Sequence, residues 1–332
     1  MKRNIKGLIL LMAISLSLVA CSSNETKTTA TDTGKTDKLK IFTTIYPFQY
    51  FTERIGGDYV TTENIVPPGS DAHSVEVTQR KMVEVAESDA FIHSGTGLES
   101  YADSVANAME GEKVKIVNAT NNVNLLGSEE VHKEEEEEHH DEHQKEETRD
   151  SHHEHGEDMD VDPHIWLDPI RSIKVAENIK NALIELSPEN KEQFEENFTL
   201  LKSDLEKLDA EFKEMVAASK TKTFIVSHSA YGYWEDTYGL EQVGINGLSP
   251  TDDPSQSQLV EIINLVKENN LKHIFFESNL TSKVALTVKK ETNTNSLTLH
   301  NLESITDEDV KENKDYFILM RENIKALKQG LN

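Results

Sequence analysis

The sequence predicts an α/β fold with two lobes, each built on a mostly parallel sheet, joined by one long rigid helix. In two separate stretches of the chain, short β-branched segments alternate with amphipathic helical segments, and this order is typical of parallel sheets covered by helices. Between the two stretches, one apolar pattern with helical spacing continues for roughly 30 residues. With 332 residues, the chain is long enough for two domains of ordinary size.

The first alternating stretch contains four expected strands with three helices between them. Gly56 and Gly57 are expected to end its first helix, and Thr78 to cap its second. We expect strands at 40–44, 61–66, 90–93 and 114–118, and helices at 48–55, 78–87 and 98–109. With a further helix at 170–186, these elements form an N-terminal α/β lobe that covers residues 39–186.

The connecting helix is predicted by an apolar stripe whose members are spaced alternately four and three residues apart. The stripe consists of Phe194, Phe198, Leu201, Leu205, Leu208, Phe212 and Met215. Ser187 and Pro188 provide a start signal. At 1.5 Å per residue such a helix is about 45 Å long, which is longer than one small domain is wide. We therefore expect residues 187–219 to link two lobes, although the same stripe could form the seam of a coiled-coil dimer.

The second alternating stretch predicts a C-terminal α/β lobe over residues 220–332. We expect strands at 223–227, 242–245, 272–277 and 296–299, and helices at 231–238, 255–269, 282–291 and 307–327. No sequence repeat relates this lobe to the first one, but the order of elements is the same. The repeated order predicts two similar lobes on either side of the connecting helix.

The start of the chain is predicted to be a targeting segment followed by a tether. Three basic residues precede an apolar stretch at 8–20 that is too short to span a membrane and has the length of a signal peptide. We expect residues 1–20 to be this signal peptide. Residues 21–38 are rich in Thr, Asp and Lys, and are expected to form a flexible tether.

Cys21 is the single cysteine, so the chain cannot form an intramolecular disulfide. The sequence Leu18-Val19-Ala20-Cys21 resembles the lipobox of bacterial lipoproteins, in which the cysteine is acylated and becomes the first residue. This resemblance implies that Cys21 anchors the protein in a lipid bilayer, because two or more acyl chains anchor a protein stably. A buried structural cysteine is the alternative.

A histidine- and acid-rich run at 129–160 interrupts the first lobe. It holds sixteen acidic residues against three basic ones, a net charge of −13, which is half of the −26 of the whole chain. Its few apolar residues cannot offset the entropy lost on ordering, so we expect a disordered loop. Imidazoles and carboxylates in this pattern are typical of weak, auxiliary metal capture. The histidines of the run are His132, His139, His140, His143, His152, His153 and His155.

The charge balance bears on the class of partner. No basic region offsets the acidic residues, which argues against nucleic acid as a partner, because phosphate would be repelled. A negatively charged chain instead attracts cations.

Candidate metal ligands lie near the carboxyl ends of the predicted strands, where open α/β sheets bind their ligands. His73 follows the second strand of the first lobe, and His228 follows the first strand of the second lobe. Glu277 ends a later strand, Glu303 follows the last one, and His164 follows the acidic run. Three histidines and one carboxylate would form a tetrahedral zinc site with no open position, whereas oxygen-rich sites suit manganese, magnesium or calcium.

Two aspartates and one further histidine lie close to these candidates. Asp71 and Asp162 each precede a histidine by two residues, so either could fix an imidazole tautomer or cap a turn. His93 ends the third strand of the first lobe, and we expect it to be a wall of the pocket rather than a ligand.

Three motifs carry a resemblance to a known family. They are Pro-Pro-Gly-Ser-Asp-Ala-His ending at His73, Asp-Pro-His-Ile-Trp-Leu-Asp-Pro around His164, and Ser-His-Ser-Ala-Tyr-Gly-Tyr around His228. These motifs resemble those of the zinc-specific solute-binding lipoproteins of bacterial ABC importers, from the lipobox to the end of the chain. The resemblance implies two ligands from each lobe, His228 and Glu303 being those of the second, with Glu277 as the substitute for Glu303. Manganese-binding relatives carry a carboxylate at the position of His228.

The resemblance implies a function and a location. It predicts a monomeric, non-enzymatic protein on the extracytoplasmic face of the cell membrane that captures Zn²⁺ and delivers it to an ABC permease. A zinc-dependent hydrolase, with Glu277 or Glu303 as general base, is an alternative. The sequence contains neither a His-Glu-x-x-His helix nor a Gly-x-Ser-x-Gly elbow to support it. A manganese-binding transport protein and an adhesin of the same family are further alternatives.

Overall fold

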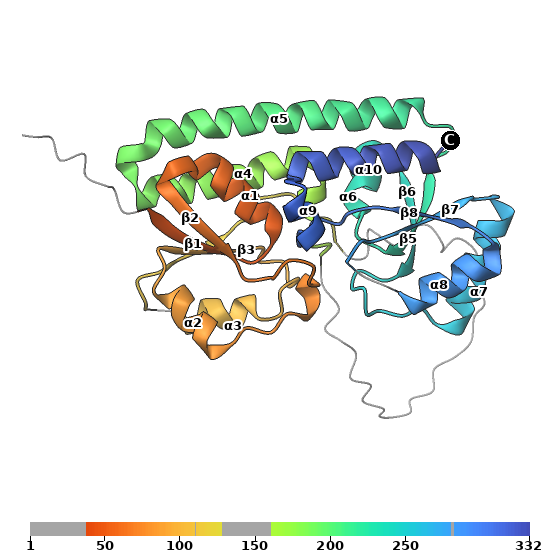
Figure 1. Cartoon of the computed structure of the whole chain (residues 1–332), viewed down its shortest axis with the longest axis horizontal. Coiled ribbons are helices and arrows are strands. Elements are labelled where there is room, and N and C mark those ends of the chain that lie inside the picture. Colours follow the sequence, from red (N-terminus) through yellow and green to blue (C-terminus); the bar gives the residue numbers. More distant parts are fainter. Residues whose placement is uncertain (1–37, 110, 128–160, 280–281) are drawn as a thin grey trace, which may run out of the picture. The chain divides into compact units, whose positions relative to one another are not determined.

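The computed structural model describes residues 38–109, 111–127, 161–279 and 282–332. These residues form two parallel four-stranded sheets with helices on their faces (Figure 1). The predicted fold class is therefore confirmed. In the part of the chain that is described, no helix has both the length and the apolar character that a membrane span requires.

The first sheet has the strand order β2-β1-β3-β4, and all its pairs are parallel. Its strands are β1 (Leu39–Thr43), β2 (Val60–Asn64), β3 (Ala90–His93) and β4 (Lys115–Asn118). Alternate side chains of a strand face opposite sides of the sheet. Ile41 and Ile92 accordingly pack in the core under α1 (Tyr46–Gly56) and α4 (Pro169–Leu186). Phe42 and Phe91 pack against α2 (Gln79–Ala86) and α3 (Ala102–Ala108) on the other face.

The second sheet repeats this plan with the order β6-β5-β7-β8. Its strands are β5 (Thr223–His228), β6 (Glu241–Asn246), β7 (His273–Phe276) and β8 (Asn295–Thr298). Ile225 and Ile274 pack against α7 (Gln256–Glu268) and α8 (Lys283–Thr292), whereas Phe224 and Phe275 join the larger core on the opposite face. That larger core also contains residues of α6 (Gly232–Tyr238).

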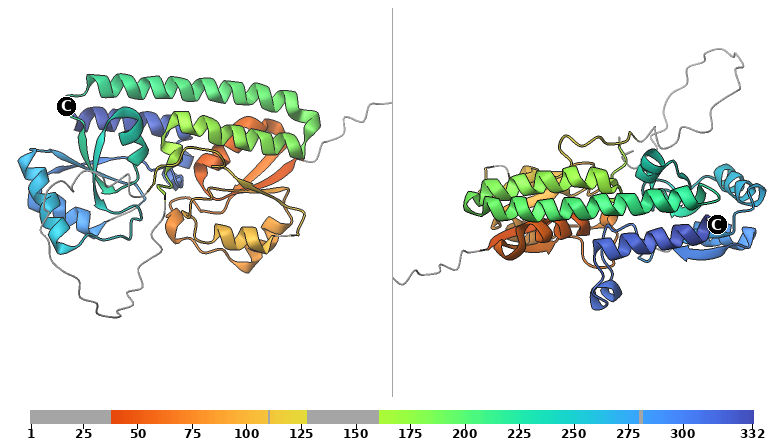
Figure 2. Two further views of the ribbon diagram at one scale, coloured as in Figure 1. Left: turned by 180° about the vertical axis from the view of Figure 1, so that it is seen from behind. Right: turned by 90° about the horizontal axis from the view of Figure 1, so that it is seen from above.

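The long helix α5 (Lys191–Ala218) contacts both lobes. It packs against α1 and α4 of the first lobe, and against α6 and α10 (Tyr316–Gly330) of the second (Figure 2). Its apolar stripe is buried inside this one chain, apart from Phe198, which is partly buried against the core. Because the stripe is covered by the chain's own helices, it is not free to form the seam of a coiled-coil dimer.

The predicted helix at 307–327 is wrong, because the structure contains two helices there. α9 (Asp307–Lys311) ends before Asn313, which has a positive φ of 54°. α10 then starts afresh, with the Asp315 side chain accepting a hydrogen bond from the Ile318 N–H as its N-cap. A left-handed residue followed by a new cap breaks the helix, although the apolar spacing continues through the break.

Two other helix starts differ from the predictions. α3 begins at Ala102 rather than at 98, after a turn in which the Ala102 N–H donates to the Glu99 carbonyl. A short 3-10 turn, Pro188–Asn190, precedes α5, and Ser187 makes no capping hydrogen bond. Its hydroxyl instead donates to the Glu189 carboxylate. By contrast, Thr78 caps α2 as predicted, accepting from the Lys81 N–H.

Candidate metal centre

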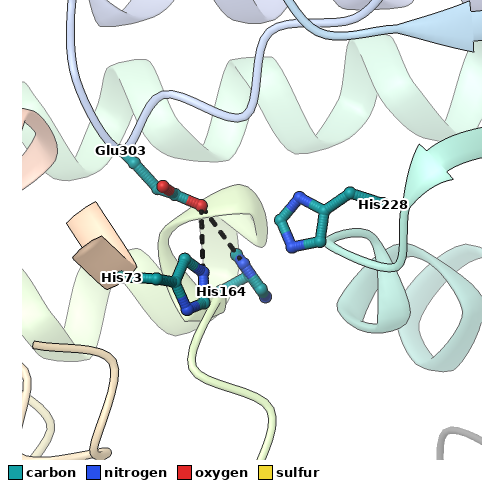
Figure 3. A group of neighbouring side chains, drawn as sticks. All are labelled: His73, His164, His228 and Glu303. Atoms are coloured by element: carbon teal, nitrogen blue, oxygen red, sulfur yellow. Dashed lines mark ion pairs between the residues drawn. The ribbon is translucent and has the colours of Figure 1, made fainter. Parts of the chain in front are cut away.

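Four predicted side chains meet at one point. One potential ligand atom from each of His73, His164, His228 and Glu303 lies within 4.8 Å of all the others (Figure 3). Three of these side chains are almost fully buried, and the side chain of His73 is only 7% exposed. The structure therefore gathers three nitrogen donors and one oxygen donor in an interior site.

His73 reaches the site from the loop that follows β2. It lies in a short 3-10 turn, Ala72–Ser74, whose N-cap is Asp71. The Asp71 carboxylate accepts a hydrogen bond from the His73 backbone N–H at 3.0 Å. Asp71 therefore caps this turn. The Nε2 atom of His73 lies 3.6 Å from Oε1 of Glu303.

His164 is held by Asp162 at two points. The Asp162 Oδ1 atom lies 2.9 Å from the His164 backbone nitrogen and 2.8 Å from the ring Nδ1. Since a carboxylate oxygen accepts, Nδ1 carries the hydrogen of this bond, which leaves Nε2 as the nitrogen for a metal. Nε2 lies 3.3 Å from Oε1 of Glu303. Asp162 therefore fixes the tautomer that a metal ligand needs, and it caps the turn as well.

The charged groups of the site shift the pKa values of one another. Burial alone would lower the pKa of His164, but the carboxylates of Asp162 and Glu303 outweigh it and raise this pKa to about 9. Burial would likewise raise the pKa of Glu303, but His73 and His164 hold it well below the usual range of a glutamate. Glu303 is therefore an ionised carboxylate at neutral pH, in the form that binds cations.

Glu303 follows β8 of the second lobe, but its hydrogen bonds reach the first lobe. The Tyr46 N–H donates to the Glu303 carbonyl at 3.0 Å, and the Ala72 N–H donates to Oε2 at 3.4 Å. Within its own loop, the Glu303 N–H donates to the Asn301 side chain at 3.3 Å. The Trp166 indole Nε1 donates to the Asn301 carbonyl at 2.7 Å. Trp166 thus connects the segment around His164 to the loop that carries Glu303.

Further contacts dock residues 304 and 305 of this loop on the first lobe, whereas the backbone of His300 is paired with the Asn323 side chain of α10. The Ser304 hydroxyl donates to the Ser70 carbonyl at 2.7 Å, and the Gly69 N–H donates to the Ile305 carbonyl at 2.9 Å. Leu302 is fully buried with a positive φ of 61°, a conformation that costs energy for a branched residue. Such a backbone persists only where its surroundings impose it, so the loop has one defined conformation.

His228 has different partners, all from the second lobe. It ends β5, and its Nδ1 lies 3.0 Å from Oε1 of Glu277. Its Nε2 lies 2.9 Å from the carbonyl oxygen of Leu248. Burial would lower the pKa of His228, but Glu277 outweighs it and raises this pKa. Glu277 is therefore placed beside the His228 ring, and it is not one of the four grouped residues.

Three atoms of the site make no hydrogen bond of good geometry. They are Nε2 of His73, Nε2 of His164 and Oε1 of Glu303, all of them buried. Buried polar atoms are normally satisfied, and the exceptions call for an explanation. The three atoms face one another within the group, so a cation bound among them would satisfy all of them at once.

The remaining sequence predictions lie elsewhere. His93 is outside the four grouped residues, and its ring stacks on Phe91 with centroids 5.6 Å apart. Cys21 and the seven histidines of the 129–160 run lie outside the described residues. The Leu248 carbonyl and the Trp166 indole were not predicted as part of the site. The role of a backbone carbonyl cannot be predicted from residue types. Trp166 could have been predicted, because it lies two residues after His164.

The chain is similar to zinc-binding proteins of bacteria. The model of a family described as zinc-uptake complex component A, periplasmic, matches residues 41–330. The zinc-binding lipoprotein AdcA of Streptococcus pneumoniae is 34% identical over 323 residues, which are 97% of this chain and 60% of that protein. This chain therefore spans less than two thirds of the length of the AdcA proteins that it matches. The high-affinity zinc uptake system protein ZnuA of Bacillus subtilis is 33% identical over 98% of this chain and 97% of that protein.

A solved structure has the same fold. The Zn(II)-bound ZnuA-like domain of Streptococcus pneumoniae AdcA superimposes with a TM-score of 0.70 at 33% sequence identity. The match covers 89% of this chain and 99% of that domain. The likeness therefore extends over both lobes and the connecting helix.

Proposed function

The chain belongs to the zinc-uptake complex component A family, and from this premise we propose that it captures zinc outside the cytoplasm and delivers it to the permease of an ABC importer. The convergence of three histidines and one ionised glutamate in a buried site is the observation that carries this proposal. The similar proteins are named for zinc binding or zinc uptake.

The proposed ligands are Nε2 atoms of His73, His164 and His228 and a carboxylate oxygen of Glu303. Neutral imidazole is a preferred ligand of zinc, whereas manganese favours sites richer in oxygen. Three nitrogens and one oxygen complete the tetrahedral shell that zinc adopts in closed sites. This donor set supports zinc over manganese as the transported ion.

A closed shell also supports transport over hydrolysis. A catalytic zinc keeps one coordination position for water or substrate. Here the fourth position is taken by Glu303, which backbone groups of the first lobe hold in place. Glu277, the other candidate for a general base, faces the ring of His228. The arrangement suits a carrier that binds its ion through protein atoms alone.

We also propose the domain organisation that the sequence predicts. Residues 1–20 form a signal peptide, and residues 21–38 form a tether anchored in the membrane through acylated Cys21. The N-terminal lobe at 39–186 and the C-terminal lobe at 220–332 flank the linking helix at 187–219. The lipobox-like sequence before Cys21 supports the anchor, and the similar protein of Streptococcus pneumoniae is named a lipoprotein. A monomer then presents its site to the permease at the membrane surface.

The test combines calorimetry with anomalous diffraction at the zinc edge. We expect one tight zinc equivalent in the wild type and a marked loss of affinity in Glu303→Gln, which keeps the shape of the side chain but removes its charge. Glu99→Gln is the matched control, because Glu99 is a buried glutamate outside the group. Diffraction should show four protein ligands on the zinc. A water molecule in place of Glu303 would favour the hydrolase instead.

A further inference from the structure

The two ring nitrogens of His228 both have partners in the second lobe. Nδ1 faces Oε1 of Glu277 at 3.0 Å, and Nε2 faces the Leu248 carbonyl at 2.9 Å. The side chains of His228 and Glu277 are 1% and 2% exposed, so water does not compete for these contacts. His228 therefore differs from His73 and His164, whose Nε2 atoms make no hydrogen bond.

The contact with Leu248 and the binding of zinc exclude each other. A carbonyl oxygen only accepts, so the Nε2 atom beside it carries a hydrogen. A nitrogen that coordinates zinc uses its lone pair and carries no hydrogen. Nε2 of His228 must therefore leave the Leu248 carbonyl when it binds zinc. The hydrogen of the neutral ring is then on Nδ1, which faces the Glu277 carboxylate.

We propose that Glu277 is a positioning residue for zinc binding, which keeps hold of Nδ1 of His228 while Nε2 exchanges the Leu248 carbonyl for the metal. This inference rests on the proposed function. Glu277 acts through the histidine and does not touch the zinc. Outer carboxylates of this kind orient the ring and strengthen it as a ligand. The buried Oε2 of Glu277 makes no hydrogen bond, so the carboxylate is committed to His228 alone.

The loop that carries Leu248 is held as a unit. The Gly247 N–H donates to the Asp252 carbonyl at 3.0 Å, and the Ser249 N–H donates to the Asp252 carboxylate at 3.0 Å. A cavity of about 400 Å³ lies against this loop, with Gly247, Asp252 and Pro254 in its lining. The loop is also tied to its own sheet, because the Ser229 N–H donates to the Gly247 carbonyl at 3.1 Å and the Asn246 side chain donates to the Pro250 carbonyl at 3.2 Å. We therefore expect the His228 ring, rather than this loop, to make the main movement when Nε2 leaves the Leu248 carbonyl.

A double-mutant cycle tests the role of Glu277. We expect Glu277→Ala to weaken zinc binding by about 10- to 100-fold, the range found for outer partners of metal ligands. Glu277→Gln should lose less, because its amide oxygen can still accept from Nδ1. In the His228→Ala background, Glu277→Ala should change the zinc affinity by less than about twofold, because the two residues act as one. An equal effect in both backgrounds would overturn the proposal.

Nitrogen NMR of the histidine rings tests the exchange itself, with the His228 signals assigned by comparison with His228→Ala. On zinc addition, Nε2 of His228 should lose its hydrogen and take the shift of a metal-bound nitrogen, while Nδ1 keeps its hydrogen. Coordination through Nδ1, or an Nε2 that retains its hydrogen in the zinc-bound protein, would overturn the proposal.

Two measurements separate the possible failures. Thermal unfolding in chelator shows whether each variant folds, and Glu99→Gln again controls for the loss of a buried glutamate. A wild type without a tight zinc site would overturn the proposed function. A wild type with such a site but no coupling between Glu277 and His228 would overturn only the present inference.

Discussion

The three ligand candidates around Oε1 of Glu303 and the fourth candidate, His228, are held in different ways. Nε2 of His73 and Nε2 of His164 lie 3.6 and 3.3 Å from this oxygen, and Glu303 is fixed by backbone groups of the first lobe. His228 is engaged by Glu277 and Leu248 of the second lobe. Three candidates are thus assembled in advance, and one has to exchange partners.

This difference bears on how the two lobes share the four candidate ligands. By chain position, each lobe supplies two of them. By contacts, the loop of Glu303 is attached to both lobes, because Glu303 bonds to Tyr46 whereas the backbone of His300 is paired with the Asn323 side chain of α10. The His228 ring, in contrast, is held by groups of the second lobe.

The largest effect should come from His164→Ala, which removes the centre of the assembled group. We expect the zinc affinity to fall by more than the roughly 100-fold that follows the loss of a residue that only hydrogen-bonds to a metal ligand. Two buried carboxylates, Asp162 and Glu303, would also lose their partner, which typically destabilises a fold by about 3–5 kcal/mol. Calorimetry with zinc and thermal unfolding in chelator measure the two losses. Retention of the tight site would show that the group is not the binding site.

A smaller effect is expected for His228→Ala. The assembled group would still offer three ligands, so we expect zinc binding to weaken by at least the roughly 100-fold that loss of an outer partner can cost, but by less than in His164→Ala. The loss of stability in chelator should also be smaller than for His164→Ala. Because ligand stabilisation scales with affinity, the thermal shift in zinc should shrink and the shift in manganese should stay small. His273→Ala is the matched control, as a histidine of the same lobe outside the group. A larger loss of zinc affinity in His228→Ala than in His164→Ala would contradict the view that His164 is the more important of the two candidate ligands.

A still smaller effect is expected for Trp166→Phe, which removes the indole hydrogen bond to the Glu303 loop. An unsatisfied Asn301 carbonyl should cost about 1–3 kcal/mol of stability, and zinc affinity should fall by a few fold because the loop loses one anchor. Trp234→Phe is the matched control. Trp234 is equally buried, but its indole donates to the Leu167 carbonyl, away from that loop. Equal losses of zinc affinity in both variants would mean that the anchor has no specific role.

The smallest effect on the tight site is expected for deletion of residues 129–157. None of the four grouped residues lies in this segment, so the tight zinc equivalent should remain. The additional weak equivalents should disappear with the seven histidines. Calorimetry resolves the two classes of site. Loss of the tight equivalent would mean that the run takes part in the site itself.

Side-chain chemistry made the members of the site predictable. His73, His228 and Glu303 follow parallel strands, and ligands gather at that edge of such sheets. For Asp71 and Asp162, the sequence left two roles equally open, fixing an imidazole tautomer or capping a turn. Only coordinates could show that Asp162 reaches the ring of His164, whereas the Asp71 carboxylate bonds to the backbone of His73. The sequence places Glu303 after a strand, but it does not reveal the backbone hydrogen bonds that attach it to the other lobe.

Features of the backbone also explain where the fold prediction was wrong. The break between α9 and α10 depends on a left-handed Asn313 and on the new cap at Asp315. Asn and Asp occur both within helices and between them, so neither residue by itself indicated a break. The continuous apolar spacing therefore led to the prediction of a single helix. The stripe of α5, in contrast, has no such interruption. The C-terminal end of this helix was predicted to within one residue, whereas a 3-10 turn at Pro188–Asn190 replaces its predicted start.

The docked 300–305 loop has a practical consequence for work with fragments. A recombinant N-terminal lobe that stops before the connecting helix would contain His73 and His164, but it would leave Tyr46 and Trp166 without the loop that they bind. Dissection at the domain boundary would therefore divide the group of four candidate ligands and expose a surface that the loop covers in the whole chain. A short synthetic peptide spanning the loop is the natural complement to such a fragment.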